Sequence, residues 1–425
     1  MRSLLLALFA FAPAARASIY LVDDDGGPGV TFTTLSAAMS AVSSGDVLIV
    51  RPGRYDGFVV DRGVSVLGDA GAIVTGGILV TGVVADDRVT LSNLMTHWIA
   101  VEHCVGSVLL EELTLRPLDF VGASHAAGLD VLDCADVRAR RVDVDQLPLG
   151  TNPGARVEAA RLELTDSRLV GARGHDHDLL LHPGAAEPGG AGLFLVAASG
   201  AVAHVQNSHV AGGVGGSITS NPALLHTPGD GGPGVRAEIG SECLIVGPVS
   251  TVIVGGRPGS EVGFACNVGA PGNGIRADAG TTVRCSGQSV QGTFDTIFCG
   301  PPIVSNPTEG PVTFAVPADP WLGFGATPTP GALVSFTLSG APGATAQLVF
   351  GRGPGVTPIV GCFEDQLTTP VRVFQLGALP PTGQKTVTLS LPGFYPRGMT
   401  IVAQGVTTSS NGAVARTPSA SITLR

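Results

Sequence analysis

A repeat of forty residues is the feature that most constrains this chain. Residues 234–241 read GVRAEIGS, and residues 274–281 read GIRADAGT. A weaker copy, GLFLV, begins at Gly192. A fixed period of this size is typical of proteins built from stacked repeats, and the alternation of apolar and polar residues within each copy is that of a β-strand. The repeat therefore predicts a β-solenoid, in which each coil buries its apolar face against the next coil.

The composition fits short strands joined by tight turns. Charged residues make up 14% of the 425 residues, and there are 61 glycines and 31 prolines. The formal net charge of −10 argues against nucleic acid or an anionic membrane as a partner, because both bind basic surfaces. It also disfavours a polyanionic glycan unless a cation or a local arginine cluster bridges the two.

The N-terminus has the features of a secretion signal. Arg2 precedes an apolar segment, residues 4–12, and Ala15-Arg16-Ala17 forms a typical cleavage site. We expect residues 1–17 to be removed and the mature protein to be secreted, extracellular or held at the cell surface. No later segment has 18 uninterrupted apolar residues, so we expect no membrane span.

Export makes disulfides possible. The chain has seven cysteines, and their spacings match no C-x-x-C metal pattern. Cys104 and Cys134 fall at equivalent places in successive coils, which lie about 4.8 Å apart. That distance is within the Cα separation that a disulfide accepts. Two interpretations stay open: a disulfide between Cys104 and Cys134, or a buried stack of free thiols.

The first coil resembles a known family. Residues 31–39 read TFTTLSAAM, residues 45–55 read GDVLIVRPGRY, and residues 64–69 read VSVLGD. These phrases are similar to the opening coil of the pectin lyase-like superfamily, and most closely to the pectin methylesterases. Those proteins begin with a phrase of the type D-F-T-T-I-Q-x-A-V, then a strand, P-G-x-Y, and a strand ending in L-x-G. The resemblance implies a right-handed parallel β-helix, capped at its N-terminal end by the amphipathic helix of residues 34–42.

We therefore expect an all-β chain in four parts. Residues 1–17 form the signal peptide, 18–299 the right-handed parallel β-helix with its short capping helix, 300–311 a Gly/Pro-rich linker, and 312–425 a small β-sandwich. The sandwich is predicted from short, turn-bounded strands that recur after the linker. The core of the β-helix should include Val108, Leu113, Val142, Leu164, Val202 and Ile275.

Long insertions rich in glycine and proline interrupt successive coils at 171–191, 211–233 and 255–273. Two of them share the wording LLLHPG and ALLHTPG, which contain His182 and His226. Because the insertions interrupt equivalent places, they should project from one side, where solenoids often bind their ligands. We expect a groove there, with His182 and His226 close together.

The catalytic sequence motifs of the pectin methylesterases, Q-D-T-L and D-F-I-F-G, are absent from this chain. A possible substitute comes from aligning the coils on Leu113, Val142, Leu169 and Val210. The residues just before these would form an outward row: Glu112, Arg141, Arg168 and His209. Three aspartates would lie near this row: Asp143, Asp145 and Asp166. A lyase could use the aspartates to hold calcium and Arg141 or Arg168 as the base. The alternative is that these charges only solvate the sheet and pair with one another.

Two functions stay open. The favoured one is a secreted or cell-surface, non-catalytic β-helix that binds a polysaccharide or a cell-surface glycan, or has a structural or adhesive role. Its binding residues would be Glu112, His209, His182 and His226. The alternative is a diverged polysaccharide-active enzyme, either a calcium-assisted lyase or a carbohydrate esterase. No cofactor is expected, apart from calcium if the protein is a lyase.

Overall fold

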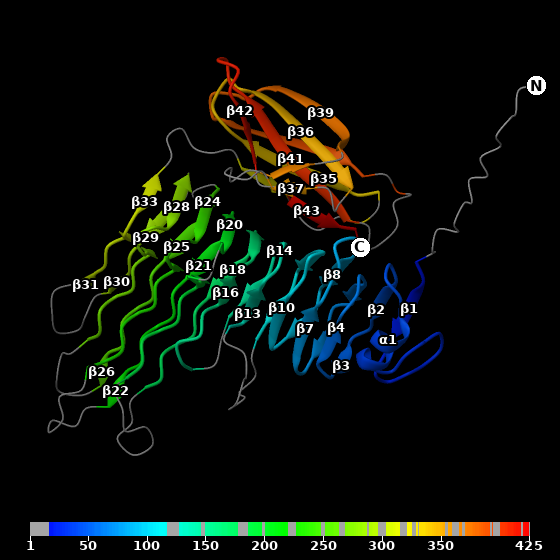
Figure 1. The fold of residues 1–425 in the computed structure, drawn as a ribbon, viewed down its shortest axis with the longest axis horizontal. Coiled ribbons are helices and arrows are strands. Elements are labelled where there is room, and N and C mark those ends of the chain that lie inside the picture. The colour runs from blue at the N-terminus through cyan, green and yellow to red at the C-terminus, as the bar shows by residue number, and fades with distance from the viewer. Residues whose placement is uncertain are drawn as a thin grey trace, which may run out of the picture.

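The structure is a computed structural model in which most of the chain after the expected signal peptide is described (Figure 1). The described residues are 17–116, 127–145, 149–176, 186–197, 200–219, 227–247, 251–262, 268–286, 289–295, 303–314, 321–324, 329, 331–352, 356–358, 365–367, 370–391, 393, 400–417 and 420–424. Three long parallel sheets form a right-handed β-helix, as predicted, and each coil adds one strand to each sheet in turn.

Sheet A is the largest of the three, with eleven strands. Its strands, in order, are β1 (Ile19–Val22), β2 (Val47–Val50), β5 (Ser65–Gly68), β8 (Arg88–Ser92), β11 (Ser107–Glu111), β14 (Asp136–Arg140), β17 (Arg161–Thr165), β20 (Val202–Gln206), β24 (Glu242–Val246), β28 (Thr282–Ser286) and β33 (Val312–Phe314).

Sheets B and C have nine strands each. Sheet B contains β3 (Gly53–Tyr55), β6 (Ala72–Val74), β9 (Met95–Thr96), β12 (Thr114–Leu115), β15 (Asp143–Val144), β18 (Arg168–Val170), β21 (His209–Ala211), β25 (Val252–Val254) and β29 (Ser289–Gln291). Sheet C contains β4 (Phe58–Val60), β7 (Gly77–Thr81), β10 (Trp98–Glu102), β13 (Leu129–Leu132), β16 (Ala155–Glu158), β19 (Leu193–Leu195), β23 (Val235–Ala237), β27 (Ile275–Ala277) and β32 (Thr308–Glu309).

The predicted capping helix is α1 (Leu35–Ala41). Thr34 begins it by accepting a hydrogen bond from the Ala37 amide at 3.2 Å, so one of the unpaired donors of the first turn is satisfied. Leu35, Ala38 and Met39 are buried at the N-terminal end of the β-helix core. Within the described residues, no helix has the length and apolar character needed to cross a bilayer.

The core is a stack of inward-facing side chains, and five of the six predicted core residues belong to it: Val108, Leu113, Val142, Leu164 and Ile275. Val202 is the exception. It is half-buried, because its neighbours Ala203 and Val205 face inward and strand residues alternate between the two faces.

The β-helix continues beyond the predicted boundary at residue 299. Parts of the predicted linker and sandwich, β32 and β33, are instead the last strands of sheets C and A. Gly310 lies between them with a φ of +87°, the conformation that Gly240 and Gly280 adopt at the same corner of the two preceding coils. The Gly-Pro pair at 310–311 is therefore a corner of the solenoid and not part of a linker.

Two small antiparallel sheets follow the β-helix, as predicted. One contains β34 (Leu322–Phe324), β35 (Leu333–Ser339) and β40 (Gln384–Ser390). The other contains β36 (Thr345–Arg352), β39 (Pro370–Ala378), β41 (Thr400–Thr408), β42 (Val414–Arg416) and β43 (Ala420–Thr423). They enclose a separate core around Phe336.

Three short pairs complete the described strands: β22 (Ile218–Thr219) with β26 (Glu261–Val262), β30 (Phe294–Asp295) with β31 (Ile303–Val304), and β37 (Val356–Pro358) with β38 (Asp365–Leu367).

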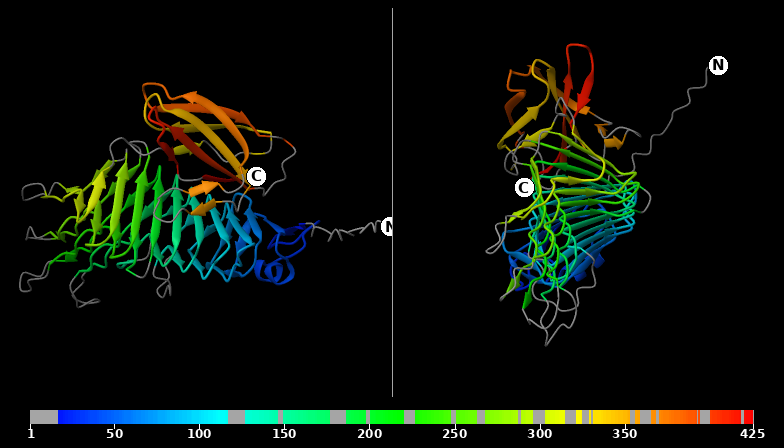
Figure 2. Two further views of the ribbon diagram at one scale, coloured as in Figure 1. Left: turned by 45° about the horizontal axis from the view of Figure 1, so that its top comes forward. Right: turned by 90° about the vertical axis from the view of Figure 1, so that its left-hand side faces the viewer.

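The C-terminal sheets lie over the outer face of sheet A (Figures 1 and 2). Trp321 packs on Leu244 and Val246 of β24, and the Gln206 side chain donates a hydrogen bond to the Leu322 carbonyl. The outward residues of sheet A are therefore buried, although several of them are charged or polar: Glu111, Arg138, Arg140, Glu163, His204 and Gln206.

The described parts of the three insertions form a single projection, which we call the Gly-rich fin: residues 171–176, 186–191, 211–219, 227–233, 255–262 and 268–273. Each insertion has a segment that leaves the β-helix and a segment that returns to it. These two kinds of segment alternate in the Gly-rich fin, and backbone hydrogen bonds join each one to the next. Gly213 N donates to Gly190 O at 2.7 Å, Gly232 N to Gly213 O at 2.9 Å, and Gly256 N to Gly232 O at 2.7 Å. A Cβ on Gly213 would lie 1.8 Å from a carbonyl oxygen, so only glycine allows this approach. The insertions thus share one side, as predicted.

Candidate functional site

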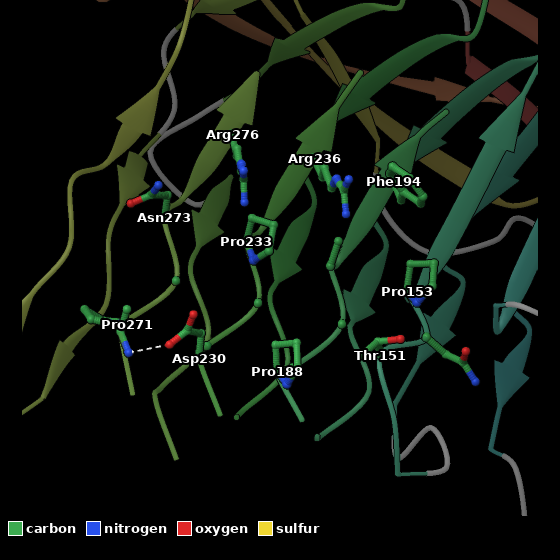
Figure 3. Close-up of a pocket in the computed structure, with 18 of the residues that line it drawn as sticks. Thr151, Pro153, Pro188, Phe194, Asp230, Pro233, Arg236, Pro271, Asn273 and Arg276 are labelled. Carbon is green, nitrogen blue, oxygen red and sulfur yellow. Dashed lines mark hydrogen bonds between the residues drawn. The ribbon is translucent and has the colours of Figure 1, made fainter. Parts of the chain in front are cut away.

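A groove of about 710 Å³ runs between the outer face of sheet C and the Gly-rich fin (Figure 3). One wall is a row of outward side chains at the same position of consecutive strands, Arg156, Phe194, Arg236 and Arg276, which we call the Arg/Phe row. Strand pairing places each of them beside the next. Neighbouring members are therefore about 4.8 Å apart along the axis of the β-helix.

The other wall is mostly backbone. Gly189, Gly190, Gly231, Gly232 and Gly272 line it without side chains, and the rings of Pro188, Pro233 and Pro271 add apolar surface (Figure 3). Asp230 and Asn273 supply polar groups on this side, and one of the Asp230 oxygens accepts a hydrogen bond from the Ala270 amide at 2.7 Å. A ligand would thus meet arginines and a phenyl ring on one side and prolines and peptide groups on the other.

Carboxylates hold the arginines in place. Arg236 contacts Glu238 at 2.9 Å and Arg156 contacts Glu158, and neither glutamate lines the groove. Arg276 lies 3.8 Å from Glu309 at the end of the groove. The guanidinium of Arg236 also lies 4.8 Å from the centre of the Phe194 ring, a cation–π arrangement. The side chains of Arg236 and Arg276 are still 47% and 55% exposed.

This arrangement suits an oxygen-rich, extended ligand. A guanidinium has five N–H donors in a planar fork and binds carboxylate or hydroxyl oxygens. Phenyl and proline rings offer flat apolar surface, and polar groups on a mostly apolar lining are typical of ligand sites. Because the row repeats once per coil, the groove matches a repeating polymer better than a single compact molecule.

The predicted outward row of Glu112, Arg141, Arg168 and His209 is wrong, because the structure divides it between two places. Glu112 and Arg141, with φ values of 52° and 50°, occupy the corner between sheets A and B, in line with Asp166. Arg168 and His209 project from sheet B beside Asp143.

An alignment error of two residues caused this. Leu113 and Val142 correspond to Ser167 and Ser208, and not to Leu169 and Val210. A serine can occupy this inward-facing corner position because its hydroxyl group both donates and accepts a hydrogen bond there. Ser167 donates to Thr165 O at 2.8 Å and accepts from Val142 N at 3.0 Å.

Both candidate lyase bases are paired with carboxylates. Arg141 lies 3.0 Å from Glu112, and Arg168 lies 2.6 Å from Asp145 and 3.4 Å from Asp143. Burial opposes the charge of Arg168, but its hydrogen bonds to the two aspartates raise its pKa. A raised pKa makes the neutral, basic form of the side chain scarcer. Burial and the charge of Arg168 lower the pKa of His209.

The three proposed calcium ligands do not converge. Asp143 and Asp145 contact Arg168 on sheet B, whereas Asp166 accepts a hydrogen bond from Asn207 at 2.6 Å in the corner row. Burial raises the pKa of Asp166. Among the described residues, no three histidine, cysteine, aspartate or glutamate side chains gather as metal ligands would.

The remaining predicted residues have mixed outcomes. His182 and His226 lie outside the described residues. Cys104 and Cys134 do occupy equivalent places in successive coils, and both are buried free thiols. The Arg/Phe row was missed, although the repeat contains it. The third residue of each copy is Arg236, Arg276 or Phe194, and Gly154-Ala155-Arg156 extends the pattern one coil further.

Comparisons with known proteins leave the family open. No protein-family profile and no curated protein sequence matches the chain. Among solved structures, the crystal structure of the Dettilon tailspike protein gp208 matches over 95% of this chain and 92% of that chain, with 11% sequence identity and a TM-score of 0.22. A likeness at this level carries no argument about the function of this protein.

Proposed function

We propose that this protein is a secreted or cell-surface β-helix that binds a polysaccharide or cell-surface glycan in the groove, without cleaving it. The Arg/Phe row carries the proposal: three guanidinium groups and a phenyl ring line the groove at intervals of one coil. It is also a local arginine cluster on a chain of net charge −10. Because each of these arginines is paired with a glutamate, the row offers N–H donors for the oxygens of a glycan rather than an excess of positive charge.

The positions of the lyase candidates favour binding over catalysis. An elimination reaction needs a base and a charge-stabilising group close to the same carbon atom. Arg141 and Arg168 lie in different rows, each paired with a carboxylate, and neither lines the groove. The groove instead offers donors and apolar rings, which are sufficient for binding.

The test is a glycan array probed with the mature protein, followed by titration of the best ligand. We expect the Arg236→Ala/Arg276→Ala double variant and Phe194→Ala each to weaken binding about tenfold or more, equivalent to about 1.4 kcal/mol. Arg168→Ala, which removes an arginine from sheet B, is the matched control and should bind like the wild type.

Two assays for cleavage accompany it: reducing-sugar release, and unsaturated-product absorbance with polygalacturonate and calcium. We expect no turnover in either. The proposal fails if no glycan binds, or if the groove variants bind as tightly as the wild type. Turnover that disappears in Arg168→Ala would support the lyase alternative instead.

A further inference from the structure

Two pairs of buried cysteines stack in the β-helix, and their geometries differ. Cys104 and Cys134 lie two residues beyond the paired positions Glu102 and Leu132 at the ends of β10 and β13. The Ala135 amide donates to the Cys104 carbonyl at 2.9 Å, so the two cysteines are directly opposite each other in adjacent coils. Adjacent parallel strands are about 4.8 Å apart, inside the range of about 4.4–6.8 Å between Cα atoms that a disulfide allows.

The second pair is offset. Cys243 is opposite Val283, and Cys285 is opposite Ile245. The two cysteines are therefore diagonal neighbours, for which the separation in a sheet is about 7–8 Å. That is too far for a disulfide without movement of the backbone. Burial also raises the pKa of the Cys243 thiol, which disfavours its reactive thiolate form.

The two sulfurs of the first pair interact with each other, and each thiol also donates to a backbone carbonyl, Cys104 to Glu102 O at 3.3 Å and Cys134 to Leu132 O at 3.1 Å. The largest influence on Cys104 is a hydrogen bond with the Cys134 side chain, and it lowers the pKa of Cys104. Desolvation opposes this, but backbone hydrogen bonds with Val83, Glu102 and Gly82 lower the pKa further. The same contact raises the pKa of Cys134. Of the two, Cys104 is thus suited to be the attacking sulfur and Cys134 the resolving one.

We propose that Cys104 and Cys134 form a disulfide between successive coils when the protein meets a small disulfide oxidant such as oxidised glutathione. The Cys104 thiolate attacks one sulfur of the oxidant and releases one glutathione thiolate, which leaves a mixed disulfide. Cys134 then loses its proton, and its sulfur attacks the Cys104 sulfur and releases the second glutathione. The protein gives up two electrons and two protons, and the oxidant becomes two glutathione thiols. The bond would tie β10 to β13 across one full coil.

Both thiols are buried, with Cys104 1% and Cys134 4% exposed, so access has to be controlled in the test. The full chain is treated in two ways: native protein is incubated with a glutathione redox buffer, and denatured, reduced protein is refolded in the same buffer. Remaining thiols are then blocked under denaturing conditions, and the products are analysed by intact mass and non-reducing peptide mapping.

We expect a linked peptide joining Cys104 to Cys134, together with blocked, unlinked Cys243 and Cys285. Cys104→Ser and Cys134→Ser should each abolish the linked peptide, and Cys243→Ser should leave it in place. A refolded protein with native circular dichroism in which Cys104 and Cys134 are both blocked as free thiols would overturn the proposal. So would pairing of either residue with another cysteine.

Discussion

The outer faces of sheets A and C carry similar chemistry in different surroundings. In sheet A, Glu111 and Arg140 on neighbouring strands form an ion pair at 2.6 Å, with side chains 0% and 3% exposed. In sheet C, Arg236 and Arg276 also stand on neighbouring strands, yet about half of each side chain is exposed. Strand geometry is the same in both places. The C-terminal sheets lie over the first face, whereas the Gly-rich fin stands beside the second and leaves a groove.

The comparison distinguishes charged side chains that stabilise the fold, such as Arg140, from charged side chains that are exposed enough to bind a ligand, such as Arg236. Burial lowers the pKa of Arg140 to about 10, and the negative charge of Glu111 opposes that effect. A buried pair of this kind is costly to break, because the remaining charge loses its partner in a place that water does not reach. An arginine in the groove can exchange water for ligand oxygens at little cost to the fold.

The largest expected effect is on the buried pair. Arg140→Ala leaves the Glu111 carboxylate buried without its closest cation, and should lower the free energy of unfolding by about 3–5 kcal/mol. Urea denaturation followed by circular dichroism measures it. Adding Glu111→Gln to Arg140→Ala should recover part of the loss, because it removes the stranded charge. A loss below about 1 kcal/mol, the range of surface pairs, would show that this face of sheet A is not sealed.

The second effect concerns the wall of the groove. In Gly213→Ala, the new methyl group would meet the Ala172 carbonyl oxygen at 1.8 Å. Backbone segments pack on both sides of Gly213 and cannot shift without breaking hydrogen bonds. We therefore expect the free energy of unfolding to fall by about 3 kcal/mol, the upper end of the usual range for overpacking. Gly393→Ala is the control, since among the described residues the atom nearest to its added Cβ is the Cα of Gly331, 3.9 Å away. Equal stability of the two variants would mean that the layers of the Gly-rich fin are looser than described.

The third effect is a dependence on pH from the covered face. Burial, with a contribution from Arg161, lowers the pKa of His204 to about 3. The unfolded chain binds that proton with an ordinary pKa of about 6.5, so acid favours unfolding. The contribution of His204 to the free energy of unfolding is fully present above pH 6.5. It decreases as the pH falls toward 3, and the loss is about 2 kcal/mol at pH 5.

Urea denaturation at pH 7.5 and pH 5 measures this dependence, with His204→Asn as the comparison. The variant should lose about 2 kcal/mol less than the wild type between the two pH values. Identical losses in the two proteins would mean that His204 is accessible to protons in the folded state.

The smallest effect is expected on the open face of sheet B. Arg168 contacts Asp143 and Asp145 with a side chain that is 44% exposed. Arg168→Ala should change the free energy of unfolding by less than about 1 kcal/mol, because solvent screens exposed pairs. Chemical denaturation at low and high salt checks it. A loss as large as that of Arg140→Ala would remove the distinction between covered and open faces.

The sequence predicted the β-helix well because its signals are local. The alternation around Val108 and Leu164 and the amphipathic helix of residues 34–42 each depend on a few neighbouring residues, and the forty-residue period is a direct repetition of sequence. The end of the β-helix was misplaced because a glycine and a proline mark a solenoid corner, as at Gly310, in the same way that they mark a linker.

The site was predicted less well, because it depends on exact alignment between coils. Serine at positions 167 and 208 replaces the apolar residue found at Leu113 and Val142, so an alignment on apolar residues slips by two positions. The cover over Glu111 and Arg140 depends on a contact between distant parts of the chain, which no local pattern reveals. The Arg/Phe row was also missed, although the repeat already places Arg236 and Arg276 at equivalent positions.

The most direct test of the central claim is a crystal structure of the protein with an oligosaccharide identified on the glycan array. We predict that the sugar chain lies along the axis of the β-helix in the groove, with oxygens bound by Arg236 and Arg276 and a ring against Phe194 or the facing prolines. A sugar bound instead over sheet B, beside Arg168 and His209, with the groove occupied only by solvent, would contradict the account.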